Sequence, residues 1–347
     1  MNKQEFGLRV KQARKLAGLS QQELADKIHV EKMTISKYET GKTYPTSTHL
    51  LALSGALGVS PEYFFRRIHI ELTAEPLCRM EKSAQKLNAK DKTRIISQTQ
   101  DFLEKRADIF DIMQIAGEEP KALRLRRSIN PAQFHAEIEK LAEEVRTEWK
   151  LGSDPVENLM SVAENNGFTI CLVDGPEQFE AAVFHDENAG TVICLKKGAP
   201  KERQRFSLAH ELGHCFIIPG ERPEAEANNF AAALLIPRDS LIADTGSKRK
   251  NIEISELLIL REKYGVSVPA LLIRMKETGI ISERLRLETQ RQYILSREGK
   301  RPHEETFASE EPRMFKLLVM RGVSEGIITV NKGRELLGDK FVCFWAA

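Results

Sequence analysis

Apolar residues recur at helical spacing through most of this chain, with polar residues between them. Near the amino end, Phe6, Val10 and Ala13 stand three or four positions apart, and Gly18 follows, so a helix ending near Gly18 is predicted. The serine and glutamate at positions 20 and 23 have the spacing of a capping box, which predicts a second helix from there. A third helix is expected over residues 31–38, and a fourth after Pro45.

The pattern changes from helical to alternating in one region only. A strand is predicted over residues 168–173, and a hairpin with strands at 181–184 and 191–195 flanks a turn rich in Asp, Asn and Gly. Helical spacing precedes and follows this region. The pattern therefore predicts a mainly α fold with a small β-sheet, of the α+β class.

The length of 347 residues exceeds that of one typical domain and predicts several. We place an all-α module at 1–66, a helical connector at 67–131, a mixed domain with the sheet at 132–245, and a helical carboxy-terminal domain at 246–347.

The distribution of charge along the chain limits which functional classes are expected. The whole chain carries a net charge of only +2, with 41% hydrophobic and 29% charged residues, so it is not a polycation built for nucleic acid. Residues 1–66 hold ten Lys or Arg against six Asp or Glu, a local excess of the sign that phosphate binding requires. A nucleic-acid partner is therefore expected at that end.

The location of the protein is predicted from what the sequence lacks. Its five cysteines lie far apart with no C-x-x-C pair, which favours reduced thiols in a cytoplasmic protein. The first residues include no apolar stretch typical of a secretory signal, and no run of eighteen apolar residues predicts a membrane span.

The first module resembles a known family through the stretch "GLSQQELADKIHVEKMTISKYETGKTYPT". Two short helices joined by a tight turn, in this sequence context, are similar to the XRE/Cro-type helix-turn-helix repressors. The resemblance implies that Lys32, Met33 and Lys37 face base edges in the major groove of double-stranded operator DNA, and that Gln21 and Lys42 meet phosphates. It also implies a homodimer on paired half-sites.

Two observations leave alternatives open in this module. Glu31 and Glu39 are acidic residues in the reading helix, where a carboxylate can accept from cytosine or repel a phosphate. The charged residues of the module can also be read as a solvated helix face without a ligand. The short basic stretch at 121–127 has the same two readings, contact with DNA or an acidic partner against simple exposure to water.

The stretch "RFSLAHELGHCF" contains the pattern H-E-x-x-H. His210 and His214 stand four apart, so both imidazoles lie on one face of a helix and can hold one metal ion. Glu211 lies beside a ligand, where its carboxylate can act as the general base. A catalytic zinc needs a third protein ligand, and both Glu224 and Glu226 are available on the next helix, pointing about 160° apart.

The paired motifs "RFSLAHELGH" and "EAEANNFAAALLIP" resemble the ImmA/IrrE-type metallopeptidases, which have a zincin-like fold. The resemblance implies that Glu224, and not Glu226, is the third ligand. Asn228 shares a helix face with Glu224 and is our candidate for a side chain that supports the metal ligands. The resemblance also implies Zn²⁺ as the cofactor, with Mn²⁺ as the alternative, and a helix-turn-helix repressor as the protein substrate.

Residues around the motif receive simpler interpretations. Cys215 is assigned to the core, and Arg203 and Arg205 either steer an acidic substrate or are simply exposed. The strand at 191–195 is our candidate for an edge that holds an extended substrate by backbone pairing.

Together these features predict a DNA-binding transcriptional regulator with a zinc endopeptidase domain that cleaves a repressor-type protein, or its own chain, in a stress, phage or toxin-antitoxin response. The alternative is a non-proteolytic transcription factor or antitoxin that uses the peptidase fold for sensing or dimerisation. Glu211 favours the first reading, because a purely structural metal site does not need that carboxylate. A digestive protease fits neither the amino-terminal sequence nor the missing signal.

Overall fold

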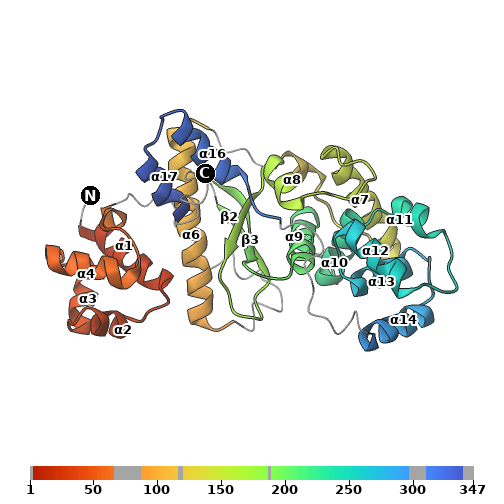
Figure 1. Ribbon diagram of the computed structural model, residues 1–347, viewed down its shortest axis with the longest axis horizontal. Helices are drawn as coiled ribbons and strands as arrows, with labels where there is room; N and C mark the ends of the chain where they lie inside the picture. Colours follow the sequence, from red (N-terminus) through yellow and green to blue (C-terminus); the bar gives the residue numbers. More distant parts are fainter. Residues whose placement is uncertain (1–2, 66–86, 116–119, 187–188, 297–309, 339–347) are drawn as a thin grey trace. The chain divides into compact units, whose positions relative to one another are not determined.

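The computed structural model describes residues 3–65, 87–115, 120–186, 189–296 and 310–338 (Figure 1). The chain divides into two compact units, which we describe separately. The first comprises residues 1–116, 173–179 and 325–347, and the second comprises residues 117–172 and 180–324. The fold is mainly helical with one small sheet, as predicted.

The first unit begins with the helices of the predicted amino-terminal module. They are α1 (Lys3–Leu16), α2 (Gln21–Lys27), α3 (Lys32–Glu39), α4 (Ser47–Leu57) and the short 3₁₀ helix η1 (Pro61–Phe65). The capping box is confirmed, because Ser20 Oγ accepts from the backbone N–H of Glu23 at 3.1 Å while Glu23 Oε2 accepts from that of Ser20 at 2.6 Å. The three residues predicted to share the inner face of the first helix are buried, each with at most 1% of its surface exposed: Phe6, Val10 and Ala13.

The long helix α6 (Ala89–Ile112) also belongs to the first unit. It packs on α1, where the guanidinium of Arg9 and the carboxylate of Glu104 form an ion pair whose side chains are only 1% and 5% exposed. Near its other end, Asp108 pairs with Lys332 of α17 (Val330–Leu337) at 3.2 Å. The helix predicted in the connector is thus present, while residues 66–86 of that connector lie outside the described residues.

The second unit contains the sheet and most of the remaining helices. Its elements are η3 (Lys121–Leu125), η4 (Pro131–Gln133), α7 (Phe134–Glu148), α8 (Leu159–Asn165), β1 (Thr169–Val173), β2 (Ala181–Asp186), β3 (Gly190–Lys196), α9 (Lys201–Phe216), α10 (Pro223–Leu235), α11 (Arg238–Thr245), α12 (Ile254–Tyr264), α13 (Val268–Glu277), α14 (Glu283–Leu295) and α16 (Met314–Ser324). In the described parts of the chain, no helix combines the length and the apolar character that crossing a membrane requires.

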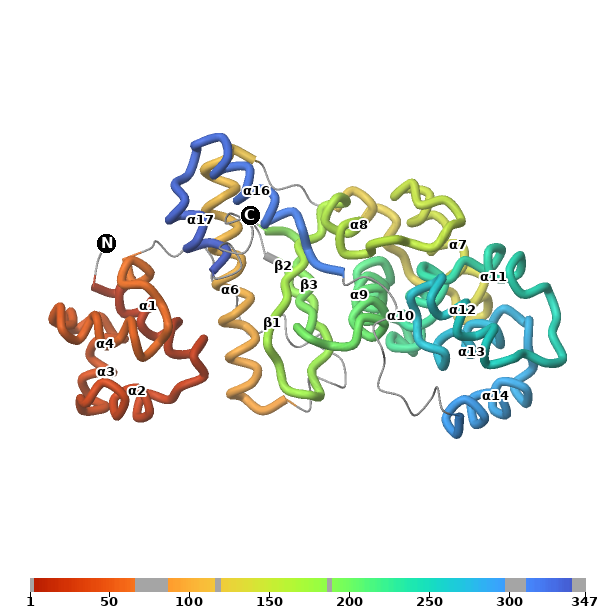
Figure 2. The backbone as a smooth tube through the Cα atoms, in the orientation of Figure 1, coloured from red at the N-terminus to blue at the C-terminus, as the bar shows by residue number. Residues whose placement is uncertain are grey.

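The sheet has the strand order β1-β3-β2 (Figure 2). The predicted hairpin is confirmed, because β2 and β3 pair antiparallel from Ala181 opposite Leu195 to Asp186 opposite Gly190. The prediction that residues 191–195 form a substrate-binding edge is wrong. β3 is the central strand, so both of its sides are already paired and its backbone groups are not available to a peptide.

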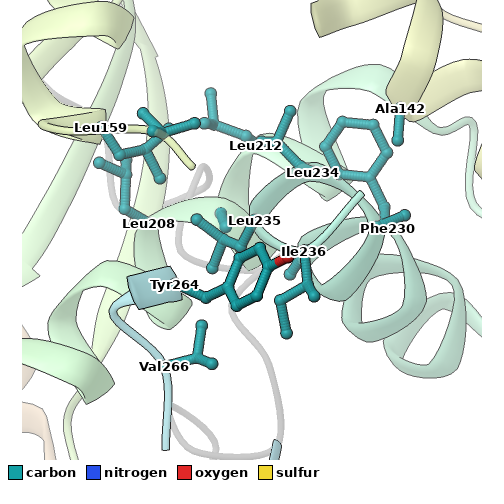
Figure 3. Packing of buried hydrophobic residues seen from close by; sticks show 14 of the residues in the cluster. Ala142, Leu159, Leu208, Leu212, Phe230, Leu234, Leu235, Ile236, Tyr264 and Val266 are labelled. Atoms are coloured by element: carbon teal, nitrogen blue, oxygen red, sulfur yellow. The ribbon is translucent and has the colours of Figure 1, made fainter. Parts of the chain in front are cut away.

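A hydrophobic core joins α9 and α10 to the helices around them. Figure 3 shows Leu212 of α9 beside Leu234 of α10, with Leu208 of α9 in the same cluster, and all three are fully buried. Tyr264 at the end of α12 lies in the same cluster. Because α9 is buried on nearly every side, its position is fixed by side-chain packing along its whole length.

Candidate metal centre and DNA-binding surface

The helices α9 and α10 pack against each other unusually closely at Gly213. A Cβ atom added to this glycine would lie 2.9 Å from the Cα and 3.1 Å from the carbonyl oxygen of Ala227. Because these are backbone atoms, no side-chain rotation could make room. Only glycine lets the two backbones approach this far, and this approach brings the first turn of α10 to the histidines of α9.

The structure brings together the three side chains predicted as metal ligands. One ligand atom each from His210, His214 and Glu224 lies within 4.8 Å of the other two. The Nε2 atoms of the two imidazoles are 3.0 Å apart. Oε2 of Glu224 lies 3.7 Å from Nε2 of His210, and Oε1 of Glu224 lies 3.9 Å from Nε2 of His214. His210 is buried, whereas His214 and Glu224 are partly open to solvent.

These separations fit a zinc ion. With bonds of about 2.0–2.2 Å and tetrahedral angles, ligand atoms around zinc lie about 3.3–3.6 Å from one another. The observed distances lie on both sides of that range, so shifts of a few tenths of an ångström would suffice. Two imidazoles and one carboxylate are also a donor set that leaves a fourth position open, as catalytic zinc sites do.

Asn228 determines how His210 presents its ring. The side-chain oxygen Oδ1 lies 2.9 Å from Nδ1 of His210. Because an amide oxygen only accepts hydrogen bonds, Nδ1 carries the proton and the lone pair of the neutral ring is on Nε2, the atom that faces His214 and Glu224. Asn228 and Glu224 are one helical turn apart on α10, so one face of that helix supplies both groups.

Glu211 is buried, at 6% exposure, on the helix that carries both histidines. Its charge acts on the neighbouring Cys215, whose pKa is raised first by burial of the thiol and second by the Glu211 carboxylate. The Cys215 thiol therefore stays protonated and belongs to the core, in agreement with the sequence interpretation.

Glu226, the other carboxylate available by spacing, has a different partner. It is 5% exposed, and its Oε2 accepts a hydrogen bond from the backbone N–H of Gly220 at 3.1 Å. It therefore fixes the loop between α9 and α10, while Glu224 faces the histidines. This difference follows from their positions two residues apart on one helix.

Neither sequence interpretation of Arg205 describes its surroundings. The residue is 4% exposed, and its guanidinium pairs with Glu310, a residue 105 positions later in the chain. The same carboxylate accepts the backbone N–H groups of Leu159 at 2.9 Å and Met160 at 3.3 Å, at the start of α8. Arg205 thus anchors α9 inside the unit and is not exposed to a substrate, whereas Arg203 is exposed, 3.6 Å from Glu180.

The basic stretch after residue 120 is bound within its own unit. Arg124 pairs with Glu148 and Arg127 with Glu144, each at 2.6 Å. The backbone N–H of Arg127 also donates to the carbonyl of Phe216 at 3.1 Å, at the end of α9. The stretch therefore supports the end of α9, a role that neither reading of the sequence described.

The predicted DNA-reading residues lie on the solvent side of the first module. Lys32, Met33 and Lys37 are all exposed on α3, and Met33 is 64% exposed even though it is apolar. Lys42 is exposed just after this helix, and Gln21 is partly exposed at the start of α2. An exposed methionine between two lysines is a surface that fits base edges, but the individual contacts remain predictions.

Glu39 does not share that surface. It is 6% exposed, and its carboxylate accepts from Arg14 Nη2 at 3.1 Å and from Gln21 Nε2 at 2.8 Å. Both predicted effects of this residue on DNA are therefore wrong, because its charge is neutralised inside the module. The partner Arg14 stands 25 positions away on α1, and local sequence pattern does not reveal it.

Two families match separate parts of the chain. Residues 10–64 match the family described as Helix-turn-helix, and residues 175–276 match the family described as IrrE N-terminal-like domain. The SPbeta prophage-derived uncharacterized HTH-type transcriptional regulator YonR of Bacillus subtilis (strain 168) is 35% identical over 72 residues, which are 21% of this chain and 67% of that regulator.

Solved structures with some likeness are those of Bacillus thuringiensis PlcR in complex with the peptide PapR7 and DNA, and of ComR from Streptococcus suis. PlcR has 12% identity and a TM-score of 0.19 over 94% of this chain and 99% of its own. ComR has 13% identity and a TM-score of 0.18 over 100% of this chain and 96% of its own. TM-scores this low give the two structures no weight for the fold or the function.

Proposed function

The chain belongs to the helix-turn-helix transcriptional regulators and carries an IrrE-like domain, and on this premise we propose that the domain is a zinc-dependent endopeptidase. The observation that supports this most is the convergence of His210, His214 and Glu224 within 4.8 Å, with Glu211 buried on the same helix as the two histidines.

His210, His214 and Glu224 would hold the ion, and a bound zinc ion, or manganese in its place, supplies a Lewis acid for the substrate carbonyl and for water. The carboxylate of Glu211 accepts the proton of the attacking water and later gives it to the nitrogen of the leaving amine. Asn228 keeps the proton of His210 on Nδ1, so that Nε2 of that ring is available as a ligand atom.

In this proposal the first module brings the activity to operator DNA. We assign Lys32, Met33 and Lys37 to base edges of the operator, and Gln21 and Lys42 to phosphates. Two copies of the chain would occupy paired half-sites, as helix-turn-helix regulators do. The substrate is a repressor-type regulatory protein or the chain itself, cut in a cytoplasmic response to stress, phage or a toxin-antitoxin system.

A purified wild-type chain and a Glu211→Gln variant test the proposal. Each is loaded with zinc or manganese and incubated alone and with helix-turn-helix repressors encoded nearby. We expect the wild type to cut a defined bond and the variant to lose on the order of 10²-fold or more in rate, because general-base catalysis contributes that much. Glu221→Gln, which changes an exposed carboxylate in the loop before α10, is the matched control and should cut normally.

Metal analysis and DNA binding separate this proposal from its rival. His214→Ala should lose stoichiometric zinc, and retained zinc would contradict the ligand assignment. If neither wild type nor Glu211→Gln cuts any protein, while zinc removal changes operator affinity, the domain is a sensor and the endopeptidase proposal is wrong.

A further inference from the structure

A cavity of about 870 Å³ opens to solvent beside α10, the helix that carries Glu224. Its walls are residues 131–136, which form η4 and the first residues of α7, together with Arg222 just before α10 and Ala225 and Asn229 within α10. All of these residues belong to the second unit. None of them belongs to the group of His210, His214 and Glu224.

The cavity lies next to the metal-facing side of α10. Successive residues of an α-helix are turned by about 100°, and residues four apart form one row along its surface. Glu224 and Asn228 form the row that faces His210. Ala225 and Asn229, each one position later, form the neighbouring row and line the cavity. A peptide bound at the metal can therefore extend a side chain into it.

Arg222 gives this cavity a specific chemistry. Its guanidinium lies over the ring of Phe134, 4.8 Å from the ring centre. Within the described residues, its side chain has no hydrogen bond or ion pair, unlike Arg205, Arg261 and Arg274 of the same unit, which pair with carboxylates. Arg222 is exposed, so the ring favours one position of its guanidinium while the five N–H donors of that group remain available to a ligand.

We propose that Arg222 binds a carboxylate of the peptide that is being cleaved, with Phe134 as the apolar floor of the subsite; this inference rests on the endopeptidase proposed above. A planar guanidinium matches a carboxylate with two parallel hydrogen bonds. The carboxylate is that of an Asp or Glu side chain near the scissile bond, or the free carboxy-terminus of the substrate. The substrates are accordingly acidic at one fixed position.

Cleavage of a peptide mixture tests the subsite. The zinc-loaded full chain is incubated with randomised peptides blocked at both ends, and the cut positions are identified by mass spectrometry. We expect Asp and Glu to be enriched at one position, with kcat/KM about tenfold above that of the matching Asn and Gln peptides. A second set without acidic residues, with free or amidated carboxy-termini, shows whether the terminal carboxylate is the ligand instead.

Variants at position 222 give the decisive comparison. Arg222→Ala should remove the acidic preference while its zinc content stays unchanged, and Arg222→Glu should shift the preference to Lys and Arg. Arg238→Ala, which removes an exposed arginine outside the cavity, is the matched control and should keep the preference.

The outcomes distinguish the two proposals. A wild type that cuts peptides without any carboxylate preference, or an Arg222→Ala variant with the same preference, overturns the subsite and leaves the endopeptidase standing. A wild type that holds zinc and cuts nothing overturns both.

Discussion

Replacing Gly213 by alanine should weaken metal binding without touching any ligand. The added Cβ would lie 2.9 Å from Cα, 3.1 Å from O and 3.2 Å from Cβ of Ala227. Non-bonded carbon atoms prefer about 3.5–4.0 Å, so α10 must move away from α9 by roughly half an ångström or more. Glu224 lies on α10 one turn before Ala227, so this movement carries its carboxylate away from His210 and His214.

The energies work in opposite directions. Overpacking of this kind costs about 1–3 kcal/mol, and replacing glycine by alanine inside a helix returns about 1 kcal/mol. We therefore expect a modest net loss of unfolding free energy, together with zinc affinity at least tenfold weaker. Denaturant unfolding of the metal-free protein and competition with a chelator measure the two effects separately.

Gly55→Ala is the matched control, because Gly55 is a helical glycine whose added Cβ would meet nothing within 4 Å. It should stabilise the protein by about 0.5–1 kcal/mol and leave zinc affinity unchanged. If Gly213→Ala behaves like Gly55→Ala in both assays, the close approach of α9 and α10 does not position Glu224.

Three further changes test other parts of the structure. Glu310→Ala should lower the unfolding free energy by about 3–5 kcal/mol in urea, because it leaves the buried charge of Arg205 without a partner, and a loss below 1 kcal/mol would contradict that role. Lys42→Ala should reduce the salt dependence of operator binding by about one unit of slope, whereas Met33→Ala should change sequence preference at constant slope, and equal slopes for both would argue against the assignment. Glu226→Gln should retain stoichiometric zinc in metal analysis, since that carboxylate contacts Gly220 and not the histidines, and lost zinc would refute this.

Local spacing was enough to predict several features correctly. The capping box at Ser20 and Glu23 needs only two residues three positions apart, and the helix then follows from capping geometry. The same holds for His210 and His214, because residues four apart on a helix share a face. The choice of Glu224 over Glu226 needed the family resemblance, since spacing alone allowed either.

The features that the sequence did not reveal depend on contacts between residues that are far apart in the chain. A hairpin predicts that β2 pairs with β3, but only the pairing with β1 makes β3 the central strand and removes it as a docking edge. Local pattern does not predict the burial of Arg205 or Glu39, because their partners are distant in the sequence. Glu310 lies 105 positions from Arg205, and Arg14 lies 25 positions from Glu39. Burial of a charge depends on that partner, and a single sequence does not identify it.

The ion pair between Arg9 and Glu104 has a consequence for how such regulators can be assembled from parts. A fragment cut at residue 66 would keep Arg9 but lose the helix that supplies its counter-charge, along with the surface that covers it. The smallest DNA-binding segment that can be moved intact from one chain to another therefore extends through α6 to residue 112. Recombination that joins a new DNA-binding module to this IrrE-like domain should succeed when the junction follows that helix, and an artificial chimera should be joined there as well.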